Sequence, residues 1–212
     1  MVDTVYVTVA DVEIGTRERL VTTARDYLDT EGIDGIGLRE IARRAGVSHG
    51  APLRHFPTLA ALLAVVAAEG FRDLFASVTA ATEAVAADDP MARLAASAFG
   101  YVRFAEANPG VFGLMFRGDL CDTQNLEYLT EGGAAFGQLV SFVGAAQAAG
   151  FHPDVPCAEL AGVLWATMHG LASLHLHGAL APTTGQTNLD VLINVANTLA
   201  FGVNAEPKEK LR

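Results

Sequence analysis

Lysine is almost absent from this sequence, and the charge balance is strongly acidic. The only two lysines, Lys208 and Lys210, lie near the C-terminal end, and the formal net charge is −10 over 212 residues. A protein that coats nucleic acid regardless of sequence needs clustered cations to neutralise phosphates. The composition therefore argues against such a protein, and any contact with nucleic acid must be local.

Cysteine is scarce as well. Cys121 and Cys157 are far apart and form no C-x-x-C pair, so the sequence favours neither a disulfide framework nor a zinc cluster. Residues 1–15 contain no lysine or arginine and no long apolar run, unlike a signal peptide or a membrane span. We expect a weakly ordered arm there, a cytoplasmic protein and no membrane partner.

What the sequence has in quantity is apolar residues at helical spacing. Hydrophobic residues make up 51% of the chain, and no stretch alternates with a period of two. In residues 16–31, Leu20 and Leu28 share one helix face, with Thr16 as the predicted N-cap and Gly32 as the C-terminal stop. The pattern predicts an all-α protein with almost no strand.

A compact two-helix unit follows this first helix. Residues 38–45 carry apolar side chains on one face, and Gly46 can adopt the left-handed conformation that ends the helix. Val47 can fill the angle between two helices, and Ser48 can cap the next helix, at about residues 49–55. This arrangement is typical of a helix-turn-helix.

The remainder of the chain is predicted to be a larger helical domain. Thr58 caps a long apolar helix that ends near Val85, and Pro90 and Pro109 suit first-turn positions, the second directly after Asn108 as a cap. Including the three helices before it, we expect about nine helices in total. Breaks are predicted at residues 118–123, 150–156 and 178–188.

The segment Gly37–Pro57 resembles the DNA-binding signature of the TetR repressor family. The resemblance is carried by Ile41-Ala42, Ala45-Gly46-Val47-Ser48, Gly50 and His55-Phe56 in that order. It implies a three-helix reader whose short third helix enters the major groove of double-stranded operator DNA. The alternative for the same residues is a small helical bundle without a DNA partner.

The resemblance also implies which residues contact DNA. Residues that open the third helix are candidates for base contacts, and four arginines are candidates for phosphate contacts. His55 either touches DNA or packs beside Phe56, while Leu53 and Leu59 stand where the family commonly has a phosphate-binding Tyr and Lys, which predicts weaker, more salt-sensitive binding. The predicted DNA-binding residues are Arg39, Arg43, Arg44, Ser48, His49, Gly50, Ala51, Leu53, Arg54 and His55.

A second, shorter resemblance lies in the larger domain. In Leu164–Ala172 the order of Trp165 and then His169-Gly170 resembles the WHG-type C-terminal domain of one branch of the same family. Trp165 and His169 share a helix face, so they could line a ligand cavity together with other aromatic and thioether side chains. The alternative is that these residues fill the core. The predicted ligand-binding residues are Phe99, Phe104, Phe112, Met115, Phe116, Trp165, Met168 and His169.

Two last helices, about residues 157–178 and 189–202, combine small and apolar residues and suit a two-fold four-helix interface, which predicts a homodimer. The alternative is that they close the monomer core. His169, His175 and His177 lack the spacing of a helical zinc site, so we expect no metal and no cofactor. An enzyme with His169 as general base ranks last, because no paired carboxylate, nucleophile–base spacing or phosphate loop accompanies it, and we expect no catalytic residues.

These observations predict a ligand-responsive repressor that binds a palindromic operator as a dimer and is released by an apolar small molecule. Side chains on the long helix would transmit the effect of ligand binding to the reader, namely Phe71, Leu74, Phe75 and Val78. The alternative is a small-molecule binding protein of the same fold with weak or lost DNA binding. The expected divisions are an arm at 1–15, a helix-turn-helix domain at 16–63, a ligand-binding and dimerisation domain at 64–204 and a tail at 205–212.

Overall fold

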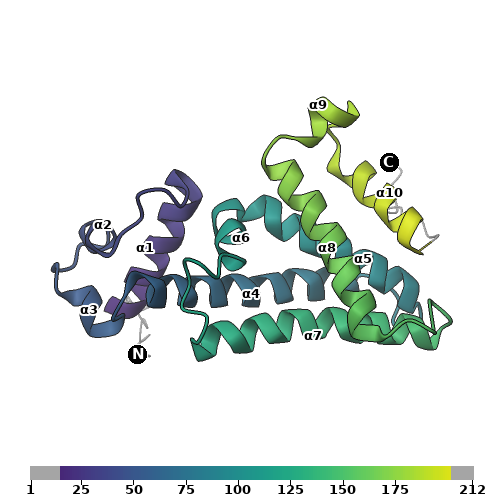
Figure 1. The fold of residues 1–212 in the computed structure, drawn as a ribbon, viewed down its shortest axis with the longest axis horizontal. Helices are drawn as coiled ribbons and strands as arrows, with labels where there is room; N and C mark the ends of the chain where they lie inside the picture. The colour runs from purple at the N-terminus through teal and green to yellow at the C-terminus, as the bar shows by residue number, and fades with distance from the viewer. Residues whose placement is uncertain (1–14, 202–212) are drawn as a thin grey trace, which may run out of the picture.

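The computed structural model describes residues 15–201, which form ten helices and no strand (Figure 1). The predicted all-helical fold is confirmed. The tenth helix is a short one, α9, within the segment 178–188 that was expected to be a break. The predicted tail, and all of the predicted arm except Gly15, lie outside the described residues. The helices are α1 Thr16–Glu31, α2 Leu38–Arg44, α3 Ala51–His55, α4 Leu59–Glu83, α5 Pro90–Ala107, α6 Pro109–Met115, α7 Leu126–Ala148, α8 Cys157–Leu176, α9 Leu180–Thr184 and α10 Leu189–Phe201.

Helices α1 to α3 form a small lobe at one end of the molecule (Figure 1). Leu20 and Leu28 of α1 are buried as predicted, and the turn after α2 places Gly46 at φ +64°. Three local predictions were wrong. Gly15 rather than Thr16 occupies the N-cap of α1, Ser48 makes no side-chain cap, and α3 begins at Ala51 after a turn in which the amide of Ala51 donates to the carbonyl of Ser48.

Helix α4 is the axis of the molecule. Thr58 caps it as predicted, its hydroxyl oxygen accepting from the amide of Ala61 at 3.1 Å, and the helix ends at Glu83, two residues before the predicted end. It packs against α1, α5, α6 and α7. One continuous apolar core runs along it from the small lobe to α10. The two lobes are therefore joined through a shared core as well as through the chain.

Polar contacts also fasten α1 to the larger lobe at both of its ends. Near its start, Arg17 pairs with Glu127 of α7 at 2.8 Å. Near its end, Asp29 accepts from the amide of Gly110 at 3.2 Å, and Arg25 donates to the side-chain oxygen of Asn108 at 2.9 Å. Asn108 precedes α6 as predicted, but its side chain does not cap that helix, because its amide nitrogen donates back to the carbonyl of Phe104.

Pro90 and Pro109 occupy the first turns of α5 and α6, as predicted. Among the helices of residues 15–201, none combines the length and the apolar character needed to cross a membrane.

Candidate functional site

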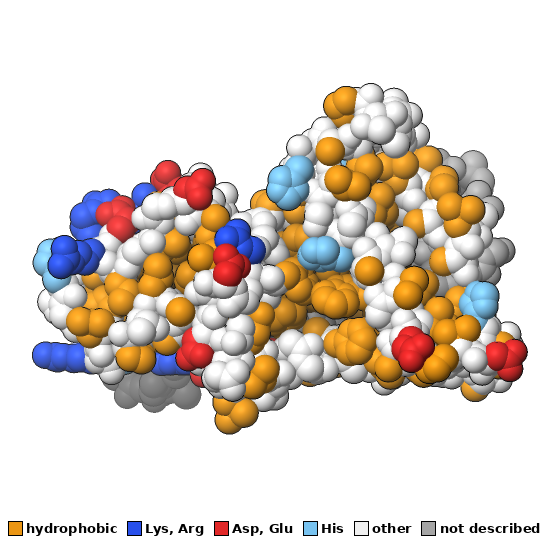
Figure 2. All heavy atoms as spheres, viewed as in Figure 1, with side chains coloured by type: hydrophobic (Ala, Val, Ile, Leu, Met, Phe, Trp, Pro, Cys, Tyr) orange, Lys and Arg blue, Asp and Glu red, His pale blue; other side chains and the backbone are white. Residues whose placement is uncertain are grey.

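The exposed end of the small lobe carries most of the predicted DNA contacts. Ser48, His49, Gly50, Leu53 and His55 are all exposed there. Figure 2 shows that basic and histidine side chains gather at this end of the molecule. The side chain of His55 faces solvent, whereas Phe56 beside it is only 3% exposed. Of the two interpretations of His55, the structure places it at the surface rather than in the core.

Two of the four predicted phosphate-binding arginines are already engaged within the protein. Glu40 accepts from Arg43 at 2.6 Å and from Arg44 at 2.8 Å, at helical spacings of three and four residues. Hydrogen bonds from Arg43 and then Arg44 lower the pKa of Glu40 to about 2. Arg44 also pairs with Glu31 at 3.2 Å and lies 4.5 Å from the ring centroid of Tyr27. Both arginines therefore share their charge with carboxylates of the protein before they meet a phosphate.

The other two predicted phosphate contacts, Arg39 and Arg54, are exposed and make no ion pair within residues 15–201. Leu53, on the short helix α3, is 62% exposed, while Leu59 packs partly against the core. Arg19 donates to the carbonyl of Ala45 and so holds the end of α2 against α1. The arginines of the reader without an ion pair in the described part of the chain are thus Arg19, Arg39 and Arg54, on α1, α2 and α3.

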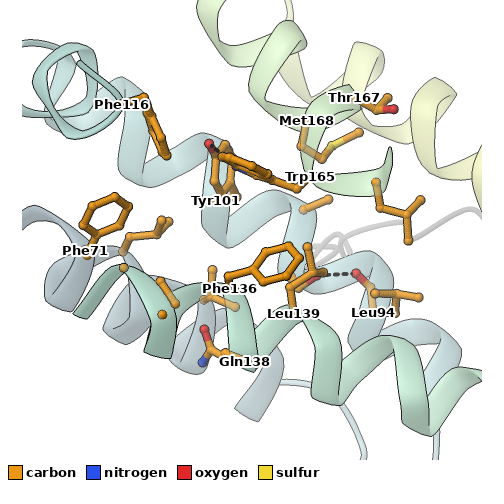
Figure 3. A pocket seen from close by; sticks show the side chains of 18 of the residues that line it. Phe71, Leu94, Tyr101, Phe116, Phe136, Gln138, Leu139, Trp165, Thr167 and Met168 are labelled. Atoms are coloured by element: carbon orange, nitrogen blue, oxygen red, sulfur yellow. Dashed lines mark hydrogen bonds between the residues drawn. The ribbon is translucent and has the colours of Figure 1, made fainter. Parts of the chain in front are cut away.

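A cavity of about 350 Å³ lies in the larger lobe, between α4, α5, α7 and α8 (Figure 3). Its volume lies in the range of pockets that hold small molecules. Among residues 15–201, no side chain that lines it is a lysine, arginine, aspartate or glutamate. The lining side chains are mostly apolar or aromatic, with a few hydroxyls and one amide, among them Phe71, Tyr101, Phe116, Phe136, Gln138 and Trp165.

The structure brings three of the eight predicted ligand residues to this cavity, namely Phe116, Trp165 and Met168. The other five are not among the lining residues. Phe99 is partly buried and packs against the core, and His169 is half-buried behind Tyr101. The remaining three are core residues that are at most 3% exposed: Phe104, Phe112 and Met115.

One wall of the cavity was not foreseen. Helix α7 contributes Leu129, Gly132, Phe136 and Gln138, none of which was among the predicted ligand residues. The signal that could have indicated this wall is Gln138 together with the adjacent glycines Gly132 and Gly133 in a mostly apolar helix, since such residues leave space and hydrogen-bonding groups in a wall.

A short hydrogen-bonded chain of side chains lies at the α5–α8 side of the cavity. The indole nitrogen of Trp165 donates to the hydroxyl of Tyr101 at 3.2 Å, and that hydroxyl lies 2.9 Å from Nδ1 of His169. His169 also packs against the rings of Phe112 and Phe116, at centroid distances of 5.2 and 4.6 Å. Burial lowers the pKa of His169 and raises the pKa of Tyr101. Both side chains are therefore uncharged at neutral pH.

Nucleophilic and metal chemistry find little support in the described residues. Burial, followed by the charge of Asp119, raises the pKa of the Cys121 thiol to about 11, which keeps it protonated and unreactive. Within residues 15–201, no group of three or more His, Cys, Asp or Glu side chains is placed to hold a metal ion.

Helices α8 and α10 carry an apolar surface. On α8, Val163 and Leu174 are 64% and 49% exposed, and on α10, Val195 and Leu199 are 51% and 83% exposed. Exposed apolar side chains grouped on neighbouring helices are typical of a protein–protein interface.

Comparisons with known proteins agree with this geometry. Residues 20–66 match the family model "Bacterial regulatory proteins, tetR family", and residues 94–195 match "Tetracyclin repressor-like, C-terminal domain". A search of curated proteins finds no match.

Among solved structures, a protein of unknown function from Rhodococcus sp. RHA1 is 32% identical, with a TM-score of 0.78, covering 94% of this chain and 100% of its own. A TetR family transcription regulator from Marinobacter aquaeolei VT8 is 16% identical, with a TM-score of 0.66, covering 88% and 94%. RolR, in complex with the ligand resorcinol, is 18% identical, with a TM-score of 0.61, covering 90% and 89%. The reader lobe and the larger helical lobe each match their own part of one family, and the chain belongs to the TetR family of bacterial transcription regulators.

Proposed function

We propose that the protein is a transcriptional repressor that binds a palindromic operator as a homodimer and is released by an uncharged, largely apolar small molecule. The observation that carries this proposal is the path of α4. Its N-terminal part packs against α1 of the reader, and Phe71, Leu74 and Val78 farther along line the cavity. A molecule that fills the cavity therefore presses on the helix that supports the reader.

A second connection runs through α7. This helix supplies one cavity wall, and its first turn holds the reader through the pair between Glu127 and Arg17. A ligand that displaces α4 and α7 changes the position of α1 and hence of α3. By thermodynamic linkage, a ligand that weakens operator binding must itself be bound less tightly by the operator-bound protein.

The apolar surface of α8 and α10 supports the homodimer. Packing this surface across a two-fold axis buries side chains such as Leu174 and Val195 and makes a four-helix interface. Two readers about 34 to 36 Å apart would then fit successive major grooves. Leu174→Glu should shift the protein toward monomer in sedimentation experiments, whereas Leu126→Glu, at a 77% exposed site on α7, should not. Equal behaviour of the two variants would count against this interface.

The central test combines DNA and ligand binding. Mobility-shift assays on DNA flanking the gene for this protein, first at low salt, should show a retarded complex that candidate ligands release. Trp165, the only tryptophan of the chain, lines the cavity, so its fluorescence reports occupancy directly. A ligand that changes Trp165 fluorescence yet leaves operator affinity unaltered would remove the induction mechanism.

A binding protein that no longer recognises DNA is the second candidate. It is favoured by the pairing of Arg43 and Arg44 with Glu40 and by the exposed Leu53 at a position where the family commonly has tyrosine. The same experiment separates the two functions. A change in Trp165 fluorescence without any retarded DNA at low salt would establish the second.

A further inference from the structure

The polar side chains that line the cavity have no hydrogen to offer a ligand, because each donor is already used within the protein. Ser97 donates to the carbonyl of Leu94 at 2.6 Å, and Thr167 donates to the carbonyl of Val163 at 2.9 Å. Tyr128 donates to the carbonyl of Met115 at 3.0 Å. What these hydroxyls still present to the cavity is oxygen lone pairs.

Gln138 is the polar lining residue whose orientation is best fixed. Its Nε2 donates to the hydroxyl oxygen of Thr79 at 2.8 Å and to the carbonyl of Phe75 at 3.3 Å. The hydroxyl of Thr79 itself donates to the carbonyl of Phe75, so neither group can donate to the glutamine oxygen. The amide therefore cannot be flipped without losing both bonds. Its Oε1 is left as an acceptor, and Figure 3 shows this oxygen turned toward the other lining side chains.

The donor hydrogens of Tyr101 and Trp165 are also used within the protein. The indole N–H is used by the hydroxyl oxygen of Tyr101. We assign the hydroxyl hydrogen to Nδ1 of His169, 2.9 Å away, with the neutral imidazole carrying its own hydrogen on Nε2. Tyr101 then retains one acceptor lone pair and no free hydrogen.

The backbone adds no donor either. The lining residues belong to helices, where each amide hydrogen is used by the carbonyl four residues earlier. At the ends, the amide of Tyr128 donates to the side chain of Asn125, that of Leu129 to the carbonyl of Asn125, and that of Phe116 to the carbonyl of Leu114. As far as the described part of the chain forms it, the wall of the cavity is thus apolar, uncharged and supplied with acceptors alone.

We propose that the effector is a neutral molecule with an apolar body and at least one hydroxyl or N–H group, and that Oε1 of Gln138 accepts that hydrogen. This inference rests on the proposed function of the cavity as the effector site. Ethers, ketones and carboxylates offer only lone pairs, so they face the lone pairs of the wall, and a carboxylate in addition finds no cation there.

The test compares three ligands of one ring system by equilibrium dialysis against the full-length protein: β-naphthol, its methyl ether and β-naphthoate. Because the ether differs from the naphthol by loss of the donor, β-naphthol should bind about three- to tenfold more tightly, the effect of one neutral hydrogen bond. β-Naphthoate should bind more weakly than the ether. In Gln138→Met, which keeps the length of the side chain but removes the acceptor, the ratio of naphthol to ether affinity should fall toward one.

Gln147→Met is the matched control. Gln147 lies on the same helix and also donates twice, to the carbonyls of His152 and Val155 at 3.0 and 2.7 Å, but it does not line the cavity. Its replacement should leave the ratio unchanged. Equal binding of naphthol and ether by the parent protein, or an undiminished ratio in Gln138→Met, would overturn the inference while leaving the cavity a ligand site. Failure of all three compounds to bind would overturn both.

Discussion

Replacing Glu40 by glutamine tests whether the arginines of α2 are withheld from DNA. In the parent protein this carboxylate accepts from Arg43 and Arg44, and their hydrogen bonds lower its pKa to about 2. The carboxylate therefore stays ionised at any pH suitable for a binding assay, and mild acid cannot relax the pairing. Its removal frees the guanidinium group of Arg43, whereas Arg44 keeps its pair with Glu31 at 3.2 Å.

The expected magnitude follows from counterion release. Each phosphate neutralised on duplex DNA contributes about 0.9 to the slope of log affinity against log salt concentration. Release of Arg43 should therefore steepen the slope by about 0.9 for each protomer, or about 1.8 for the homodimer. Between roughly 200 and 50 mM salt, the affinity of Glu40→Gln should then rise about tenfold more than the affinity of the parent.

The assay is a titration of a fixed DNA duplex at several salt concentrations, followed by fluorescence anisotropy. Glu106→Gln is the control, because Glu106 pairs with Arg103 at 2.6 Å across three residues of α5, on the larger lobe, and its loss changes the net charge equally. The control should leave the slope unaltered. If Glu40→Gln and the control behave alike, α2 does not hold its arginines away from DNA, and the argument fails.

Two further predictions concern the larger lobe and its junction with the reader. A Cβ on Gly110 would collide with the backbone carbonyl of Leu28, so Gly110→Ala should lower stability by about 1–3 kcal/mol in thermal unfolding. A Cβ on Gly113, in the same helix, would have no atom within 4 Å, so Gly113→Ala should stabilise the protein by up to about 1 kcal/mol. Equal effects of the two variants on stability would contradict this packing. Because burial lowers the pKa of His169, the folded protein binds its proton less readily than the unfolded chain. Stability should therefore be lost as the pH falls below the ordinary histidine pKa of about 6.5, and urea titrations of His169→Gln should show a weaker loss.

The reader could be predicted because its signals are local. Gly46 ends α2 with a positive φ, and Thr58 caps α4 through its hydroxyl, each within four residues of its effect. The start of α3 was misplaced for a related reason. Ser48 can cap a helix, but its side chain competes with a backbone turn that places the first helical residue at Ala51, and sequence alone does not decide between them.

The cavity could not be predicted in the same way, because helical periodicity shows that a face is apolar without showing what covers it. Phe104 and Phe112 have the same character as Phe116, yet the first two are buried in the core while the third lines the cavity. Which of these rings faces the cavity depends on how α7 and α8 pack over α4 and α5, and helical periodicity does not show that packing. By contrast, the pairing of Glu40 with Arg43 and Arg44 was available from spacing alone, since residues three and four apart meet on a helix.

The acidity of the whole chain matters less to DNA binding than the few charges near α3. At physiological ionic strength, screening reduces the interaction between exposed charges over about 8 Å. Helix α4, with 25 residues, is about 37 Å long, and α8 to α10 lie at the opposite end of the molecule from α3 (Figure 1). Acidic residues on those distant helices are therefore screened from the reader. Glu40, by contrast, holds two of the arginines predicted to contact phosphate, so this one side chain should govern operator affinity more than the net charge of −10 does.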